Sequence, residues 1–197
     1  MRKITAHYIY RGEGEPVKYG IVTLADGVVV SISEPASSLR EAEATEFYPG
    51  VIMPAIVGVT TSNDDTVWTP TSNQEVLDVI NSQQTLPIFA VITPENIAQL
   101  AADALESILS KEIMLVLGGK THQVHLFRLL QSLSQKLPAL SFTQLVAIAC
   151  TNGAAAMQLR DKGRIAPHLR PGICHVSRFD FKRQNISENS QINILTC

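Results

Sequence analysis

The alternation of apolar and polar residues divides the chain into β-rich ends and a middle of mixed character. Near the N-terminus, short runs of β-branched and aromatic residues predict strands, and Asp26-Gly27 is a typical hairpin turn between two of them. Pro49-Gly50 predicts another turn, and similar β character returns from Gly172 onward. The strands expected in these ends are 3–10, 20–24, 28–32, 45–48, 173–181 and 191–196.

Between these ends, buried strands alternate with amphipathic helices. Val51–Thr61 is an almost continuous apolar run, as expected for a strand covered on both faces in a parallel sheet. Helix starts are marked by Ser72, by Thr93-Pro94 and by Ser141, and Thr151 is expected to cap a further short helix. Strands are predicted at 51–61, 86–92 and 113–117, and helices at 72–80, 94–108, 124–133 (with Val124, Phe127, Leu130 and Leu133 inward), 141–150 and 151–157.

The composition predicts one globular unit of ordinary charge. The chain has 197 residues, of which 45% are hydrophobic and 17% charged, so a real core is expected. Sixteen basic and eighteen acidic residues give a net charge of −2 without a basic stripe, which argues against nucleic acid as a partner. No apolar run is long enough for a bilayer, residues 1–15 lack a secretory apolar segment, and three cysteines suit reduced thiols. We therefore expect a cytoplasmic protein with no membrane partner.

Two segments resemble the amidohydrolase superfamily, and its imidazolonepropionase- and chlorohydrolase-like members in particular. Residues 48–62 (YPGVIMPAIVGVTTS) are similar to the segment that opens the family's barrel, in which an Asn/Asp-x-His-x-His run follows a second Pro-Gly pair. Residues 149–157 (ACTNGAAAM) with 163–173 are similar to its closing Ala-Thr-x-Asn-Gly-Ala motif. With the N-terminal strands, the resemblance covers 1–62 and 113–197.

The resemblance implies a fold of class α/β plus β. In the family, both chain ends build one small β-sandwich beside a metal-bearing (β/α)₈ barrel, so we expect a composite β-sandwich from 1–50 and 172–197. A complete barrel usually needs about 250 residues. The segment between Thr60 and Gly118 leaves room for about one further βα unit. Residues 51–171 are therefore expected to form a truncated barrel remnant, a small parallel sheet covered by helices.

The residues at the family's metal positions do not suit a metal. The resemblance places Thr60 and Ser62 where the family has His-x-His, and Lys120 where it has the Asp that completes the metal site and takes a proton from water. Zinc takes imidazole, thiolate or carboxylate ligands, and the positive charge of a lysine repels a cation. We therefore predict no metal, no cofactor and no catalytic residue.

A small molecule, if one binds, is expected at the carboxyl ends of the parallel strands. Gly118-Gly119-Lys120-Thr121 superficially resembles a phosphate loop but lacks the lead of a Walker motif, so only a weak anion site with Lys120 at the following helix start stays open. The predicted rim consists of Asn63, Asp64, Thr93, Gly119, Lys120 and Thr121.

Other chemistry-bearing residues have simpler interpretations. His122 and His125 share a helix face but lack further ligands at matching spacing, which favours two surface or half-buried histidines. Ser62 and Cys150 are nucleophile candidates without a supporting motif, and the apolar helix around Cys150 favours an inert thiol. Trp68, in a polar loop, either covers the end of the α/β part or marks a contact with another chain.

Two function classes follow from these expectations. The favoured one is a degenerate, non-catalytic relative that acts as a binding or assembly module. The alternative is a metal-dependent hydrolase of carbon–nitrogen bonds other than peptide bonds, acting on a small cyclic or amidine-type substrate. Its site would be rebuilt from His122, His125 and Asp64 or completed by a second subunit. Because a shortened barrel leaves sheet edges uncovered, we expect a homodimer or a protein partner.

Overall fold

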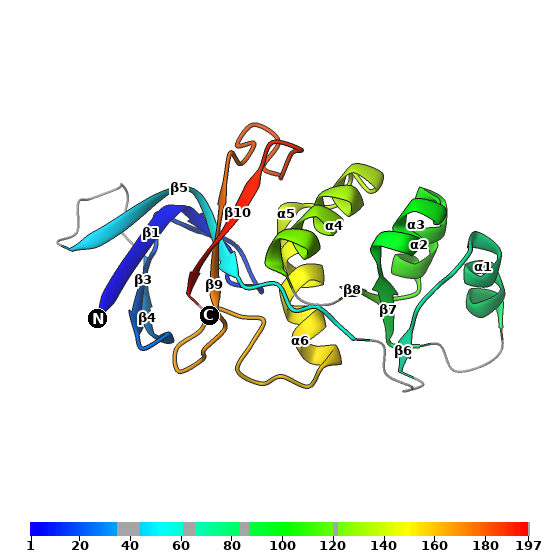
Figure 1. Cartoon of the computed structure of the whole chain (residues 1–197), viewed down its shortest axis with the longest axis horizontal. Coiled ribbons are helices and arrows are strands. Elements are labelled where there is room, and N and C mark those ends of the chain that lie inside the picture. Colours follow the sequence, from blue (N-terminus) through cyan, green and yellow to red (C-terminus); the bar gives the residue numbers. More distant parts are fainter. Residues whose placement is uncertain (35–43, 61–65, 83–86, 120–121, 197) are drawn as a thin grey trace.

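The computed structural model describes residues 1–34, 44–60, 66–82, 87–119 and 122–196. Figure 1 shows an elongated molecule with a large sheet at one end and most of the helices, around a small sheet, at the other. The two labelled chain ends lie at the large sheet. Among the described residues, no helix is long and apolar enough to span a membrane.

The large sheet contains strands from both ends of the chain. Its order is β10-β9-β5-β1-β3-β4, with β2 paired to β1; β1 and β5 are parallel and the other pairs are antiparallel. The two chain ends therefore meet in one mixed sheet, whereas the second stacked layer of a sandwich stays a prediction. The strands are β1 (Arg2–Ile9), β2 (Val17–Lys18), β3 (Ile21–Ala25), β4 (Val28–Ser33), β5 (Thr45–Pro54), β9 (Ile173–Ser177) and β10 (Gln191–Thr196).

The turn predicted at Pro49-Gly50 is wrong, because β5 runs through it. Ala6 pairs with Tyr48 and Tyr8 with Val51, so the strand accommodates these residues in a bulge. Gly50 has a φ of 132°, a backbone conformation that favours glycine. Residues 51–54 consequently belong to the large sheet and not to the parallel sheet predicted for them.

The small sheet is parallel, as predicted, and begins later than predicted. It has the order β6 (Val67–Trp68), β7 (Phe89–Ile92) and β8 (Met114–Leu117). Val59 lies beside the end of β8, where its N–H donates to the Leu117 carbonyl at 2.8 Å and its carbonyl accepts from the Gly119 N–H at 3.3 Å. The chain that leaves β5 thus adds a short strand-like segment at the β8 edge.

Helices cover the small sheet, and side chains cap three of them as predicted. The hydroxyls of Ser72, Thr93 and Ser141 each accept the N–H three residues further on. Val124, predicted to face inward, is exposed, whereas Phe127, Leu130 and Leu133 are buried. The helices are α1 (Asn73–Asn81), α2 (Pro94–Gln99), α3 (Ala102–Ser110), α4 (Gln123–Lys136), α5 (Phe142–Val146) and α6 (Asn152–Ala156), with a π-helical turn at Ala147–Thr151 between the last two.

The helix predicted after Pro94 is in fact two helices, α2 and α3. At the break, the Ala101 N–H donates to the Asn73 side-chain oxygen at 2.8 Å, and the Lys136 ammonium donates to the Leu100 carbonyl. These partners satisfy backbone groups that a continuous helix would have paired internally. Both lie far from the break in the sequence, which is why local periodicity does not reveal it.

One buried cluster joins the two parts of the molecule. It includes Val51 and Cys174 of the large sheet, Leu117 of the small sheet, and Leu130 and Phe142 of the helices. A second cluster lies within the large sheet and a third around β7. Because the largest cluster crosses from sheet to helices, the two parts are packed as one body.

Candidate functional site

The described part of the predicted rim is uncharged. Thr60 follows the segment beside β8 and is exposed, Thr93 follows β7 and is half-buried, and Gly118-Gly119 follow β8. The parallel bridge between Val59 and Gly118 places Thr60 and Gly119, the residues that follow them, at the same edge. The Thr93 hydroxyl accepts from the Asn96 N–H at 3.2 Å, so it already serves as a helix cap. The described part of this edge therefore offers the exposed Thr60 hydroxyl and peptide groups.

A close packing contact explains the first glycine of this edge. A side-chain carbon on Gly118 would lie 2.3 Å from a Val91 methyl group, so only glycine lets β8 approach β7 here. Gly119 has a φ of 128° and open space around it. The other predicted rim and metal positions lie outside the described residues: Ser62, Asn63, Asp64, Lys120 and Thr121.

His122 and His125 lie at the start of α4, as predicted, and both are exposed. Their ring centroids are 5.9 Å apart with an angle of 77° between the planes. Within the described ranges, no group of three or more His, Cys, Asp and Glu side chains could hold a metal ion. Both histidines are therefore on the surface, and their having no metal role stays a prediction.

The motif at 150–153 holds the two parts of the molecule together. The Thr151 hydroxyl donates to the Gly12 carbonyl at 2.7 Å, and the Asn152 amide donates to the Leu115 carbonyl of β8 at 3.0 Å. Thr151 has helical backbone angles (φ −68°, ψ −47°) inside a continuous helical run, so its predicted role as a helix cap is wrong. The polar residues of this motif therefore act between elements.

Cys150 is a core residue of the same junction. Its thiol is buried and donates to the Pro54 carbonyl at 3.4 Å. Burial raises the pKa of the Cys150 thiol well above its usual range, and the nearby Cys174 thiol acts in the same direction. A buried thiol with a raised pKa forms little thiolate, in agreement with an inert role.

Gln123 is a positioning residue that the sequence pattern does not reveal. Its amide oxygen accepts from the Ile56 N–H and its amide nitrogen donates to the Ile56 carbonyl, both at 2.7 Å. The side chain thus pairs with the segment after β5 as a neighbouring strand would. Because Ile56 is distant in sequence, no local signal identifies this pair.

Trp68 is engaged within the chain. Its indole N–H donates to a Glu75 carboxylate oxygen at 2.8 Å, and its ring packs, half-buried, against the largest core cluster. The other Glu75 oxygen accepts from Thr71. Glu75 therefore connects the loop after β6 with α1, and Trp68 covers the core at that end.

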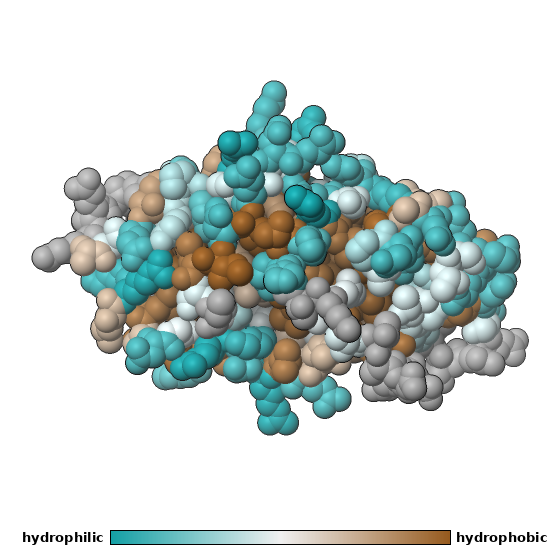
Figure 2. Space-filling view, in the orientation of Figure 1, coloured by the Kyte–Doolittle hydropathy of each residue, from teal (hydrophilic) through white to brown (hydrophobic). Residues whose placement is uncertain are grey.

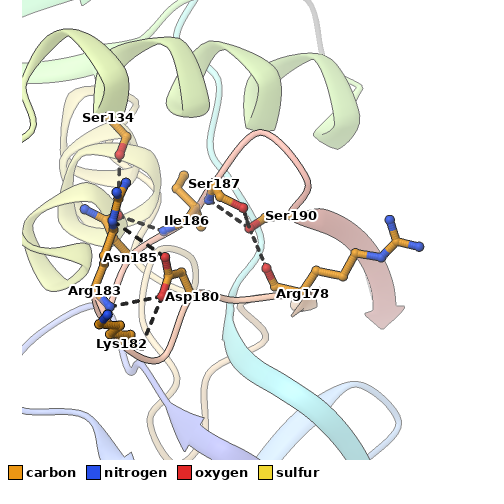
Figure 3. A network of polar contacts seen from close by, with 9 residues as sticks. All are labelled: Ser134, Arg178, Asp180, Lys182, Arg183, Asn185, Ile186, Ser187 and Ser190. Carbon is orange, nitrogen blue, oxygen red and sulfur yellow. Dashed lines mark hydrogen bonds and ion pairs between the residues drawn. The ribbon is translucent and has the colours of Figure 1, made fainter.

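The connection between β9 and β10 forms a polar network that contacts α4 (Figure 3). The strand predicted over 173–181 ends at Ser177, because Asp180 accepts the N–H groups of Lys182 and Arg183 at 3.0 and 3.1 Å and turns the chain. The Asn185 side-chain oxygen accepts from the Ser134 hydroxyl of α4 at 3.4 Å. This loop is a contact between the sheet and the helices, with no cluster of catalytic type among its drawn residues.

Solved structures match this fold, whereas no protein-family model and no curated protein matches the sequence. An amidohydrolase from Thermotoga maritima matches with a TM-score of 0.57 and 8% identity over 98% of each chain. An adenosine deaminase from Xanthomonas campestris, solved with bound zinc, has a TM-score of 0.54 and 12% identity over 92% of this chain and 86% of that one. An enamidase described as an amidohydrolase superfamily member has a TM-score of 0.51 and 8% identity over 89% and 86%.

The predicted resemblance to the amidohydrolase superfamily is thereby confirmed at the level of the fold. Identities of this size show the fold alone and carry no reaction or substrate with them. The mixed sheet, the small parallel sheet and the helices form a partial version of that fold.

The donor groups on the described rim do not fit the metal that this fold implies. Thr60, which the sequence resemblance places at a family histidine, is exposed and offers a hydroxyl, and neighbouring Gly119 offers no side chain. Zinc sites need imidazole, thiolate or carboxylate groups, usually three or more from the protein. Neither threonine nor glycine can act as the base that a metal-activated water requires.

Proposed function

We propose that this chain is a non-catalytic, amidohydrolase-like pseudoenzyme that acts as a binding or assembly module. The observation that carries the proposal is the chemistry of the described strand ends. Thr60, which the resemblance places at a metal-ligating histidine, offers a hydroxyl, and neighbouring Thr93, Gly118 and Gly119 add hydroxyl and peptide groups. The lysine at position 120 in the sequence supports it, because an ammonium group repels a metal ion.

The proposal includes the arrangement expected from the sequence. The two chain ends form a composite β-sandwich, the remainder is a truncated barrel, and the protein acts in the cytoplasm as a homodimer or with a protein partner. The open small sheet supports an assembly role. Among the described residues, β6 has a partner only on its β7 side, and uncovered strand edges are usually paired or protected.

Zinc titration by calorimetry, followed by an activity screen with added zinc, tests the proposal. We expect no saturable zinc binding and no release of ammonia or amine from cyclic amides, amidines and aminated heterocycles. Stoichiometric binding together with turnover that a chelator abolishes would reject the non-catalytic role.

The alternative is a metal-dependent hydrolase of non-peptide carbon–nitrogen bonds with a rebuilt or intersubunit site. The observation in its favour is the exposed His122–His125 pair. A H122N/H125N double variant separates the two functions, because it removes both imidazoles. Both positions are exposed and asparagine keeps hydrogen-bonding capacity, so the replacement is a mild one. Zinc binding that the double variant loses would favour the alternative, whereas identical titrations of both proteins would favour the non-catalytic role.

A further inference from the structure

An apolar hollow of about 330 Å³ lies between the large sheet and α4. Its walls come from the segment after β5 (55–58), the start of α4, the end of β10 and the loop before β9. In Figure 2, hydrophobic side chains gather near the middle of the visible face, in the region where Figure 1 places β10 and the chain leaving β5. The volume of the hollow lies within the range of about 300–1,000 Å³ that is usual for small-molecule pockets.

Large apolar side chains stand exposed at this hollow. Ile194 of β10 is 52% exposed and Leu159 is 41% exposed, and both belong to its lining. Leu126 of α4 closes the inner side and is buried. Water therefore meets an apolar surface that a ligand with an apolar body would cover favourably.

Gly58, in the wall of the hollow, has a backbone N–H and a carbonyl without a partner among the described residues. Along the segment after β5, Val57 and Val59 donate to Ala149 and Leu117 on one side, and Ile56 pairs with Gln123 on the other. By strand alternation, the Gly58 N–H and carbonyl face the same side as those of Ile56. Among the described residues, none bonds either Gly58 group, so the hollow contains a donor and an acceptor as well as apolar walls.

Lys162 supplies the charge of the hollow; among its described lining residues, no other carries one. The side chain is 32% exposed, and its ammonium donates to the Arg170 carbonyl at 2.7 Å. Among the described residues, the Asp161 carboxylate pairs with this ammonium at 4.0 Å and is 57% exposed, which makes it a weak partner. The ammonium therefore retains hydrogen-bonding capacity towards an anion.

We propose that this hollow binds a small carboxylate with an apolar tail. The tail covers the exposed surface between β10 and α4, and the carboxylate pairs with Lys162. The charge of the single cation selects an acid over a neutral apolar molecule, and the small volume selects a small molecule over a protein segment. The proposal goes beyond the proposed function, because it uses none of the rim residues and holds whether or not the rim takes a metal.

Two-dimensional amide NMR of the full chain, titrated with octanoate and with 1-octanol as the neutral counterpart, tests the proposal. We expect saturable shifts at the amides of 56, 58, 126 and 194. K162M should weaken octanoate binding about five-fold while leaving octanol binding unchanged, since a partly exposed ion pair contributes on this scale. K182M removes another exposed lysine, outside the hollow, and should change the affinity for neither ligand.

A second variant protects the test against a folding effect at Lys162. T196W places a large side chain in the hollow and should weaken the binding of both ligands. The amide spectrum checks that the variant remains folded. The proposal is overturned if octanoate causes no saturable shifts at these amides, or if wild type and K162M bind it equally. It is also overturned if light scattering shows a dimer that T196W dissociates, because a second copy would then occupy the hollow. Zinc titration remains the separate test of the proposed function.

Discussion

Gly153 allows α6 to lie against the chain that leaves β5. A side-chain carbon at this position would lie 2.4 Å from the Val57 carbonyl oxygen. The Val57 backbone is held in place because its N–H donates to the Ala149 carbonyl. We predict that Gly153→Ala lowers the free energy of unfolding by about 1–3 kcal/mol, the usual cost of overpacking. Urea denaturation followed by circular dichroism measures the change.

Ala155 provides the matched control for this substitution on the same helix. It is exposed, so Ala155→Ser adds one heavy atom into solvent and should change the free energy of unfolding by less than about 0.5 kcal/mol. Equal unfolding curves for Gly153→Ala and wild type would show that the close contact is not what holds α6 in place.

Glu46 links acid stability to the edge of the large sheet. Its carboxylate accepts hydrogen bonds from Arg2 and from the Tyr48 hydroxyl, and these bonds lower the Glu46 pKa from 4.5 to about 2. Because the pKa is depressed in the folded state, the stabilisation is present above pH 4.5 and is lost as the pH falls towards about 2. The side chain is 49% exposed, so screening limits the contribution to about 1 kcal/mol or less.

The comparison of wild type with Glu46→Gln across this pH range checks the prediction. The difference in free energy of unfolding should be constant near neutral pH and should shrink through the acid range. Glu13→Gln is the comparison variant, since it removes another exposed carboxylate paired with an arginine. A Glu46→Gln difference that stays constant down to about pH 2 contradicts the account.

At the scale of elements, Gln131 of α4 makes the shortest contact to the β9–β10 connection among the described hydrogen bonds from that helix. The Gln131 amide nitrogen donates to the carbonyls of Ser187 at 2.6 Å and Ser190 at 3.1 Å. We predict that Gln131→Ala costs about 1–2 kcal/mol, because these carbonyls lose a half-buried partner. Hydrogen exchange should quicken between residues 185 and 192 first.

Gln135, one turn further along α4, is the control for this contact. Its amide donates only to the exposed Glu188 carboxylate at 3.3 Å, so Gln135→Ala should leave exchange in the loop nearly unchanged. Equal protection of the loop in Gln131→Ala and Gln135→Ala would contradict the assigned role of Gln131.

Elements were predictable wherever local signals decide the structure. The caps at Ser72, Thr93 and Ser141 and most strands follow from short patterns. Three features could not be predicted in this way: the break after α2, the uninterrupted β5 and the contact of Thr151 between elements. Each of these depends on partners far away in the sequence, and a local pattern contains no information about them.

At the scale of the whole molecule, the sequence predicted the amidohydrolase-type fold, whereas the assignment of Thr60 to a former metal position stays a prediction. It could not predict the hollow beside Lys162, because that space arises where β10, α4 and the segment after β5 converge. It also missed Gln123, whose side chain pairs with that segment. The fold could be predicted because its motifs follow strands along the sequence, whereas cavities depend on how separate elements pack.

The most direct test of the central claim is the metal content of untagged protein, purified without chelator and measured by inductively coupled plasma mass spectrometry. The hydroxyl and peptide groups of the described rim, together with the lysine at position 120 in the sequence, predict zinc, iron, nickel and manganese far below one equivalent per chain. One equivalent or more of any of these metals, retained through gel filtration, would contradict the claim that this amidohydrolase-type fold works without a metal centre.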